Sequence, residues 1–402
     1  MLKLGIIREG KTPQDNRVPL TPLQCREVQE KFPEVKVIVQ SSNVRCFSDS
    51  QYRNAGIKVQ EEMDNCSVLM GIKEVRVEDL IPGKTYFCFS HTIKEQEYNR
   101  KLLQTILQKK IRLVDYEVIT DKEGNRIIGF GHFAGLVGAY SGIRAWGLRN
   151  GFFWLKPAWK CQGLNELYAQ MKTVKIPPLK IVVTGGGRVA GGSLDILNFL
   201  NLKQLSPSLF LETKAPGEPV FAQLRPRDYA RRKDGDTFIA EHFFRFPEMY
   251  ENAFLPFAHS SDMLIAAAFW DPKSPVLFTA EDIRNPNFRI EVISDITCDI
   301  EGSIPSTKRA SHIHDPYYDY NPVTEQPEPP FSSPRNITVQ AVDNLPNELP
   351  EDASEDFGRT LIDEVFPSLF GKDNDGIIQR ATITSEGKLT PGFSYLENFV
   401  SG

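Results

Sequence analysis

The sequence predicts an α/β protein built from two Rossmann-like domains, with parallel sheets and an interdomain cleft. Apolar stretches alternate with helical patterns over the first third of the chain, as in a parallel sheet that carries helices on both faces. The same alternation starts again near residue 179. There an apolar strand runs into a glycine cluster and then into a helix, which is the pattern of a nucleotide-binding α/β unit.

The first domain is expected to alternate strands and helices. Residues 2–7 form a short apolar run closed by two charged residues, which predicts a strand. Thr21 followed by Pro22 predicts the start of a helix, because threonine caps the first turn and proline suits the first helical position. A second helix is expected over residues 95–109. Further strands are expected at residues 35–40, 66–72, 85–90 and 112–116.

The second half continues the pattern with three special segments. Residues 135–149 are rich in small side chains and predict a helix that packs tightly between the domains. Residues 317–335 are rich in proline and tyrosine, which predicts an ordered excursion or linker. A last helical stretch over residues 351–370 is expected to break at Pro367. The other expected elements are strands at 179–184, 263–269 and 289–296 and a helix at 192–200.

The composition of the 402-residue chain excludes several classes of protein. With 41% hydrophobic and 25% charged residues, it has the profile of an ordinary globular protein. The net charge of −5 argues against a general nucleic-acid binder, which needs a basic face. The longest apolar run, residues 263–270, is much shorter than a membrane-spanning helix. We therefore expect small-molecule partners, with no nucleic acid and no membrane.

Cysteine usage and the N-terminus predict a cytoplasmic location. Six cysteines are scattered without a C-x-x-C pair, which is typical of a reducing compartment. Lys3 interrupts the first apolar stretch, so no signal peptide is expected. His312 and His314 stand two residues apart, but no cysteine or carboxylate has matching ligand spacing, and no metal site is expected.

The most specific motif is the glycine turn that follows the strand at residues 179–184. It reads Gly185-x-Gly187-x-x-Ala190. Because glycine lacks a Cβ, such a turn lets backbone N–H groups approach a pyrophosphate, and the following helix N-terminus favours its charge. We therefore expect a dinucleotide site, with a tight structural turn as the alternative.

The choice between NAD and NADP stays open. An acidic residue about 20 positions after the turn would bind the ribose 2′-hydroxyl of NAD. The next expected strand, residues 202–205, is followed by Ser206 and Pro207, and Glu212 comes only later. Arg188 is a candidate partner for the 2′-phosphate of NADP.

Two polar groups follow apolar strands of the first domain. Lys73 and Glu74 follow the strand at 66–72, and His91 follows the strand at 85–90. Ligands bind at the carboxyl ends of such strands. A lysine whose pKa is lowered by burial and an imidazole can act as base and acid. The alternative is a solvated lysine and a histidine that forms only a structural hydrogen bond.

Three more charged residues are candidates for binding a substrate. Arg17 precedes the first helix, and its guanidinium can hold a carboxylate through two hydrogen bonds, with a surface arginine as the alternative. Glu117 and Arg126 flank an expected β-hairpin whose turn is at residues 121–124, which leaves both side chains available for a functional role.

Several motifs occur in a fixed order along the chain and resemble one family. The motifs are DNRVPLTP at 15–22, GIKE at 71–74, FSHTIK at 89–94, IRLVDYE at 111–117, FGHFAG at 130–135, DITCDIEGS at 295–303, AVDNLP at 341–346 and RATITSEGKL at 380–389. Together they resemble the saccharopine dehydrogenase (L-lysine-forming) and lysine–2-oxoglutarate reductase family, within the alanine dehydrogenase and transhydrogenase group. The resemblance spans nearly the whole chain, although the glycine turn matches only in part.

The resemblance implies a reaction and a set of site residues. The ε-amine of L-lysine condenses with 2-oxoglutarate, and hydride from NAD or NADP reduces the imine to saccharopine. By the same resemblance Lys73 is the base and His91 the acid. The residues implied to bind substrate are Arg17, Arg126, Glu74 and Glu117. The residues implied to bind the cofactor are Gly185, Gly187, Arg188, Val189, Ala190 and Asp343.

The resemblance also implies how the domains divide. Residues 1–137 and 336–402 are expected to form the substrate domain, and residues 138–335 the dinucleotide-binding domain. The chain is expected to be a monomer or a homo-oligomer. Two alternatives remain: an alanine dehydrogenase that joins pyruvate and ammonia, and a nucleotide-binding regulatory protein without turnover.

Overall fold

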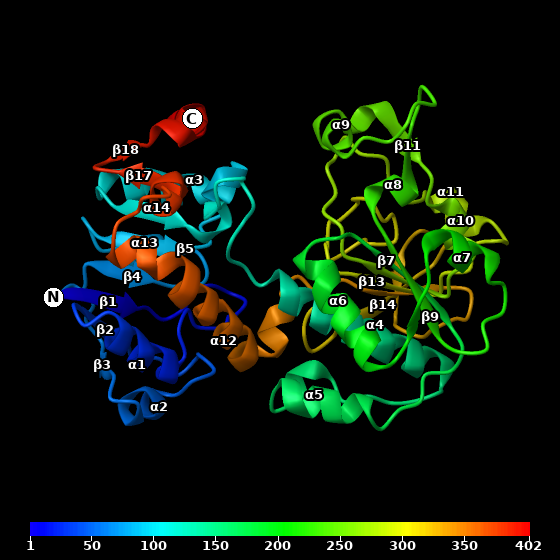
Figure 1. The fold of residues 1–402 in the computed structure, drawn as a ribbon, viewed down its shortest axis with the longest axis horizontal. Coiled ribbons are helices and arrows are strands. Elements are labelled where there is room, and N and C mark those ends of the chain that lie inside the picture. Colours follow the sequence, from blue (N-terminus) through cyan, green and yellow to red (C-terminus); the bar gives the residue numbers. More distant parts are fainter. The chain divides into compact units, whose positions relative to one another are not determined.

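The computed structural model describes residues 1–402 as two compact units, shown in Figure 1. Unit 1 comprises Met1–Phe130 and Pro350–Gly402, and unit 2 comprises Gly131–Leu349. Each unit contains an eight-stranded sheet in which six parallel strands are extended at one edge by two antiparallel strands. The predicted α/β class with two mostly parallel sheets is therefore confirmed.

The sheet of unit 1 has the order β18-β17-β6-β5-β4-β1-β2-β3. Its strands are β1 (Leu2–Ile6), β2 (Val35–Gln40), β3 (Lys58–Gln60), β4 (Val68–Met70), β5 (Thr85–Cys88), β6 (Arg112–Asp115), β17 (Thr382–Ser385) and β18 (Lys388–Leu389). Its α-helices are α1 (Pro22–Lys31), α2 (Asp49–Asn54), α3 (Glu97–Gln108), α12 (Pro350–Thr360), α13 (Phe366–Phe370), α14 (Ile377–Ala381) and α15 (Glu397–Ser401). In Figure 1 the orange and red C-terminal elements of this unit lie beside its blue N-terminal elements.

Helix α1 begins where the sequence predicts. The Thr21 hydroxyl accepts a hydrogen bond from the Gln24 backbone N at 3.3 Å, and the Gln24 side chain accepts one from the Thr21 backbone N at 3.0 Å. This reciprocal capping box satisfies two of the N–H groups that every helix start leaves unpaired. Pro22 occupies the first turn, where its missing N–H costs nothing.

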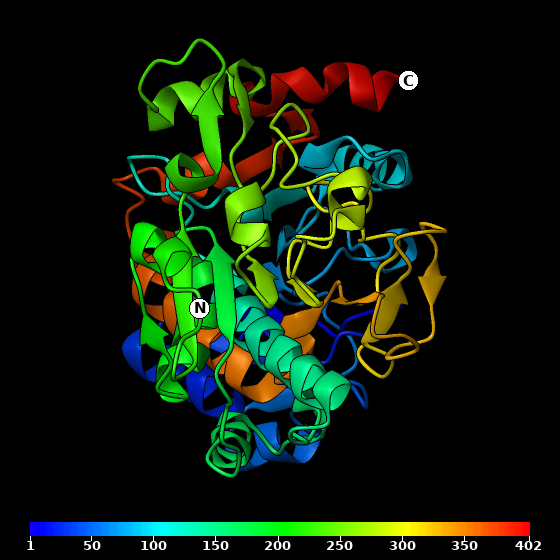
Figure 2. The same cartoon turned by 90° about the vertical axis from the view of Figure 1, so that its right-hand side faces the viewer.

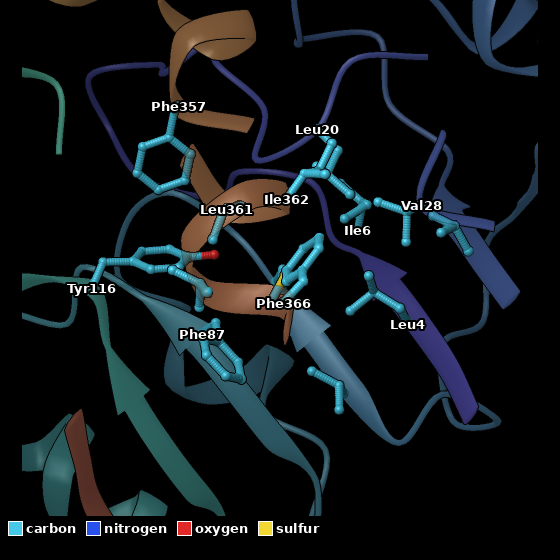
Figure 3. Close-up of a cluster of buried hydrophobic side chains, with 14 of the residues drawn as sticks. Leu4, Ile6, Leu20, Val28, Phe87, Tyr116, Phe357, Leu361, Ile362 and Phe366 are labelled. Atoms are coloured by element: carbon cyan, nitrogen blue, oxygen red, sulfur yellow. The ribbon is translucent and has the colours of Figure 1, made fainter. Parts of the chain in front are cut away.

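The C-terminal segment completes the core of unit 1. Figure 3 shows Phe357, Leu361, Ile362 and Phe366 packed against side chains of the N-terminal segment. The ring of Phe357 stacks on Phe130 with centroids 4.5 Å apart and meets Tyr116 edge-on at 5.1 Å. Burial of these aromatic faces, together with the pairing of β17 with β6, holds the two distant parts of the chain in one unit.

The sheet of unit 2 has the order β15-β14-β16-β13-β12-β7-β9-β8. Its strands are β7 (Lys180–Thr184), β8 (Lys203–Gln204), β9 (Val220–Leu224), β12 (Met263–Ala266), β13 (Val292–Asp295), β14 (Tyr317–Tyr320), β15 (Pro327–Glu328) and β16 (Ile337–Gln340), and β10 (Ala230–Arg232) pairs separately with β11 (Tyr250–Asn252). Its α-helices are α4 (Gly131–Asn150), α5 (Leu164–Met171), α6 (Arg188–Phe199), α7 (Pro207–Glu212), α8 (Pro226–Tyr229), α9 (Ala240–Arg245), α10 (Leu255–Ala258) and α11 (Ala280–Arg284).

Helices α4 and α6 pack against each other at very short range, and Figure 1 shows them together. A Cβ built on Gly135 would lie 1.8 Å from the backbone O of Val189, and one built on Gly192 would lie 1.9 Å from the backbone O of His132. Only glycine fits at these two crossing points. The small residues expected at 135–149 thus serve a close helix contact inside unit 2.

The compact units divide at residues 130/131 and 349/350, not at the expected 137/138 and 335/336. The first difference arises because α4 is one continuous helix from Gly131 that packs on α6. The second arises because β16 is hydrogen-bonded in parallel to β13 and therefore belongs to the sheet of unit 2.

Two local predictions need correction, and a third is confirmed. Residues 317–335 are not only an excursion, because Tyr317–Tyr320 form the buried strand β14, which pairs antiparallel with β16 and is drawn in gold in Figure 2. Pro367 does not break the last helix, because a π-helical turn at Leu361–Val365 precedes it and a wider turn accommodates a residue without an N–H. The expected hairpin with its turn at 121–124 is present, although it is short. Its strands form one antiparallel bridge, between Thr120 and Arg126, and the Ile127 N–H donates to the Ile119 carbonyl at 2.9 Å.

The cysteines and the helices have two further properties. All six cysteines are unpaired. None of the helices has both the length and the apolar character needed to cross a membrane.

Candidate active site

Lys73 and Glu74 lie directly beyond the carboxyl end of β4, where Glu9 holds their backbone. One carboxylate oxygen of Glu9 accepts the backbone N–H of Ile72 at 2.6 Å, and the other accepts that of Lys73 at 2.9 Å. Burial and the nearby Asp15 raise the pKa of Glu9 to about 7. Glu9 follows β1, the neighbour of β4 in the sheet, so adjacent strand ends build this part of the site.

Glu74 joins two basic side chains. Its Oε1 lies 2.6 Å from Nδ1 of His91, and its two oxygens accept hydrogen bonds from Nζ of Lys11 at 2.9 and 2.8 Å. Burial alone would raise its pKa, but the hydrogen bonds from His91 and Lys11 outweigh burial and lower it to about 2. Glu74 is therefore a carboxylate at neutral pH.

The ionised Glu74 determines which imidazole nitrogen carries a proton. A carboxylate only accepts hydrogen bonds, so Nδ1 of His91 must be the donor in their contact. In the neutral imidazole this leaves the lone pair of Nε2 available to accept a proton. His91 also has a left-handed backbone, with φ of 52°, which is unfavourable for a residue with a Cβ and common at functional sites.

The ammonium group of Lys73 is set apart from the carboxylates. Within the protein its Nζ has no hydrogen bond and no ion pair, whereas Lys11 takes up both oxygens of Glu74. Burial, together with repulsion from Arg17, lowers the pKa of Lys73 below its ordinary value. Lys73 and Glu74 also line a cavity of about 340 Å³.

Arg17 is buried and paired. Its Nε and Nη2 donate to the two oxygens of Asp15 at 3.0 and 2.6 Å, and its guanidinium lies 4.1 Å from the ring centre of Phe130. One edge of the guanidinium is thus occupied by Asp15, which leaves Nη1 for a ligand. Arg17 contributes to the charge environment of both Glu9 and Lys73, so it belongs to the same cluster.

Glu117 and Arg126 form a second group near His91. Oε1 of Glu117 lies 3.4 Å from Nζ of Lys94 and 4.0 Å from Nη1 of Arg126. The second oxygen of Glu117 is buried without a hydrogen bond. Arg126 lies over the ring of Phe89, with 37% of its side chain exposed.

Asp115 connects the second group to the first. Its carboxylate accepts the backbone N–H of Glu117 at 2.7 Å and that of Ser90, the neighbour of His91, at 2.9 Å. The structure therefore brings together the six residues of unit 1 that were predicted to act on substrate. It adds four residues that the sequence analysis did not identify: Glu9, Lys11, Asp15 and Asp115. Glu9 and Asp115 stand at strand ends, so the rule that selected Lys73 and His91 applies to them as well.

The raised pKa of Glu9 leads to a prediction about stability. Because the pKa of Glu9 is higher in the folded than in the unfolded protein, protonated Glu9 contributes to the free energy of unfolding. This contribution is fully present below pH 4.5 and is lost as the pH rises through about 7. Between these values the free energy of unfolding of the wild type should fall, relative to Glu9→Gln, by up to about 3 kcal/mol. Urea unfolding at a series of pH values measures this difference.

A matched control for Glu9 is Glu61→Gln. Glu61 pairs with Arg8 and is 54% exposed, so its pH profile should run parallel to that of the wild type. If the Glu9→Gln profile is also parallel, Glu9 does not carry a raised pKa.

The glycine turn of unit 2 connects β7 to α6. Gly185 has φ of 105°, and a Cβ there would meet the backbone O of Ala267 at 2.7 Å, so this position needs glycine. A Cβ on Gly187 would meet nothing within 4 Å, which leaves open space at the N-terminus of the 12-residue helix α6. A pyrophosphate fits such a cradle, because backbone N–H groups and the helix dipole face it.

The other predicted cofactor residues surround this turn or share its edge of the sheet. Arg188 is the exposed first residue of α6, whereas Ala190 is buried and the carbonyl of Val189 packs against Gly135 of α4. Asp343 follows β16, whose carboxyl end lies at the same edge as that of β7 because the strands between them are parallel.

Strand β9, not the next strand in sequence, is the neighbour of β7. Its last residues approach the turn: the Gln223 side chain donates to the Gly185 carbonyl at 2.9 Å, and the guanidinium of Arg225 lies against Gly186. Neither was predicted, because the sequence analysis took residues 202–205 as the second strand. No group of three or more His, Cys, Asp or Glu side chains in the chain is arranged to hold a metal ion.

Known proteins are similar to this chain over one or both units. Residues 5–137 match the family model "Alanine dehydrogenase/PNT, N-terminal domain". Alpha-aminoadipic semialdehyde synthase of Rattus norvegicus is 28% identical over 98% of this chain and 47% of its own length. Saccharopine dehydrogenase (NAD+, L-lysine-forming) of Emericella nidulans is 24% identical over 89% of each chain. A solved L-alanine dehydrogenase has 16% identity and a TM-score of 0.66 over 99% of this chain and 100% of its own.

The relatives differ in length. The chain spans less than half of the alpha-aminoadipic semialdehyde synthases that it matches, whereas it covers about nine tenths of the saccharopine dehydrogenases. The L-alanine dehydrogenase structure supports the fold. Taken with the motif order, these matches support the resemblance to the saccharopine dehydrogenase and lysine–2-oxoglutarate reductase family of oxidoreductases, within the alanine dehydrogenase and transhydrogenase group.

Proposed function

We propose that the chain is an NAD(P)-dependent oxidoreductase that interconverts saccharopine with L-lysine and 2-oxoglutarate. The observation that carries the proposal is the cluster of Lys73, Glu74 and His91 at adjacent strand ends, which provides an amine of lowered pKa and an oriented imidazole. Imine chemistry near neutral pH needs such a pair of proton carriers. Relatives of nearly equal length that are named for lysine-forming saccharopine oxidation support the choice of substrate.

The chain's own residues account for the proton transfers. Neutral Lys73 accepts a proton from the ε-ammonium of the substrate lysine, whose freed amine then attacks the ketone carbon of 2-oxoglutarate. In the adduct a proton moves from the attacking nitrogen to the former ketone oxygen. Protonated His91 then delivers a proton from Nε2 to the resulting hydroxyl, which leaves as water and yields the protonated imine. Glu74 orients His91 by accepting a hydrogen bond from its Nδ1. When bound, the nicotinamide cofactor supplies the hydride that reduces the imine.

The cofactor would be held by unit 2 residues. Gly185 and Gly187 leave room for the pyrophosphate, and the N-terminus of α6, which begins at Arg188, provides N–H donors. Val189 and Ala190 fix the helix start through packing, and Asp343 is proposed for the nicotinamide end.

The proposal is tested by following NADPH and NADH oxidation at 340 nm with purified protein. Lysine plus 2-oxoglutarate should support oxidation, and pyruvate plus ammonium should not. Oxidation only with pyruvate and ammonium would identify an alanine dehydrogenase instead. Cofactor binding without turnover of either pair would favour the regulatory alternative.

Arg126 is proposed to bind a carboxylate of the oxo acid. It is a partly exposed guanidinium held over Phe89 beside Glu117. Arg126→Ala should raise the KM for 2-oxoglutarate about 10- to 100-fold, because a charge-assisted pair of hydrogen bonds is lost. Arg126→Lys keeps the charge without the fork and should be intermediate. Initial rates at varied 2-oxoglutarate measure the effect, and an unchanged KM removes Arg126 from the substrate site.

A further inference from the structure

The strand beside the glycine turn ends in an arginine. β9 runs parallel to β7 with Thr184 opposite Leu224, so Arg225 is the first residue beyond the sheet next to the turn. β8 pairs only with β9 and therefore lies one strand farther out. In this fold the residue at this end of the neighbouring strand faces the adenosine ribose of a dinucleotide whose pyrophosphate sits at the turn.

The guanidinium of Arg225 is positioned against that turn. A Cβ built on Gly186 would lie 2.9 Å from Nη1 and 3.3 Å from Cζ of Arg225. Gln223, two residues earlier, donates to the Gly185 carbonyl and ties the strand end to the turn. Arg225 is exposed, and its guanidinium has no hydrogen bond or ion pair within the protein.

No carboxylate lies at the end of β9, where an acid would bind the ribose 2′-hydroxyl of NAD. The nearest acid in sequence, Asp228, accepts the backbone N–H of Arg225 at 2.7 Å and caps α8. An acid at this strand end would bind a ribose 2′-hydroxyl and repel a 2′-phosphate, whereas an arginine pairs with the phosphate. Arg188, the sequence-based candidate, lies instead on the α4 side of the turn, where its Cβ is 3.6 Å from a Cβ built on Gly131.

We propose that Arg225 binds the adenosine 2′-phosphate, so that the chain prefers NADPH to NADH. This inference rests on the dinucleotide site of the proposed function and is independent of the substrate that unit 1 binds. It identifies Arg225 as the residue that determines cofactor specificity.

The test is a binding measurement on the full chain, without substrate. Dissociation constants for NADPH and NADH come from fluorescence titration, with adenosine 2′,5′-bisphosphate and 5′-AMP as competitors. The wild type should bind NADPH at least about tenfold more tightly than NADH. Arg225→Gln should weaken NADPH binding by about 10- to 100-fold and leave NADH binding nearly unchanged.

A matched control is Arg231→Gln. Arg231 is an exposed arginine paired with Glu251 on the separate ribbon of β10 and β11, and its loss should leave both affinities unchanged. Equal binding of NADPH and NADH by the wild type, or an unchanged preference in Arg225→Gln, overturns the role of Arg225 while the dinucleotide site stands. If neither cofactor nor competitor binds, both this inference and the proposed cofactor are wrong.

Discussion

Lys73→Met is expected to lower kcat for lysine and 2-oxoglutarate by about 10²- to 10⁴-fold, the usual range for loss of a general acid–base group. Methionine keeps the length and much of the packing of lysine but cannot accept a proton. The backbone of Lys73 is held by Glu9, so the local fold should survive the change. Steady-state rates, with melting temperature and cofactor affinity measured alongside, give the result.

Two further measurements separate catalysis by Lys73 from a structural role. Lys101→Met, on the exposed face of α3, should leave kcat unchanged. The pH profile of kcat/KM of the wild type should contain an ascending limb below the ordinary range of lysine, because burial lowers the pKa of Lys73, and Lys73→Met should lose that limb. Full activity of Lys73→Met would show that another group is the base.

The second large effect is expected on stability. Gly192→Ala should lower the free energy of unfolding of unit 2 by about 3 kcal/mol, because its Cβ would lie 1.9 Å from a backbone carbonyl of α4 and 2.8 Å from the Leu136 N. Backbone atoms cannot rotate away as a side chain can, so the two helices must separate. Urea unfolding followed by circular dichroism measures the loss.

The neighbouring glycine provides the control. Gly191 lies in the same helix, and a Cβ there would meet nothing within 4 Å. Gly191→Ala should therefore stabilise the protein slightly, by about 0.5 to 1 kcal/mol, through the better helix propensity of alanine. If Gly191→Ala and Gly192→Ala have equal effects, the close contact between α4 and α6 does not determine stability.

Much of the candidate site follows from one local rule. Lys73, His91 and the glycine turn were predicted because each follows an apolar run, and parallel strands place such residues at one edge of a sheet. The sequence does not predict the contacts that these residues make with other side chains. Lys11 and His91 share Glu74 because the fold brings three separate segments together, and sequence spacing does not specify how those segments lie in space.

Segments of the fold that sequence patterns missed have identifiable causes. Tyr317–Tyr320 was assigned to a proline-rich excursion, although the strand β14 ends before the first proline of that region. Pro367 was expected to break the last helical stretch, but the π-helical turn before it accommodates the proline. In the first case the local pattern itself favours a strand, because tyrosine is common in strands. In the second the helix continues past the proline.

The sequence by itself determined the α/β class, the helix start at Thr21, the strand-end positions of Lys73 and His91, and the glycine turn, because these depend on local periodicity and backbone chemistry. Only the tertiary structure decided that β9, and not the next strand in the chain, lies beside β7, and so that Arg225 is the residue at the turn. The physical reason is that strand order is selected by long-range burial and hydrogen bonding across the whole sheet, and no short stretch of sequence carries that information.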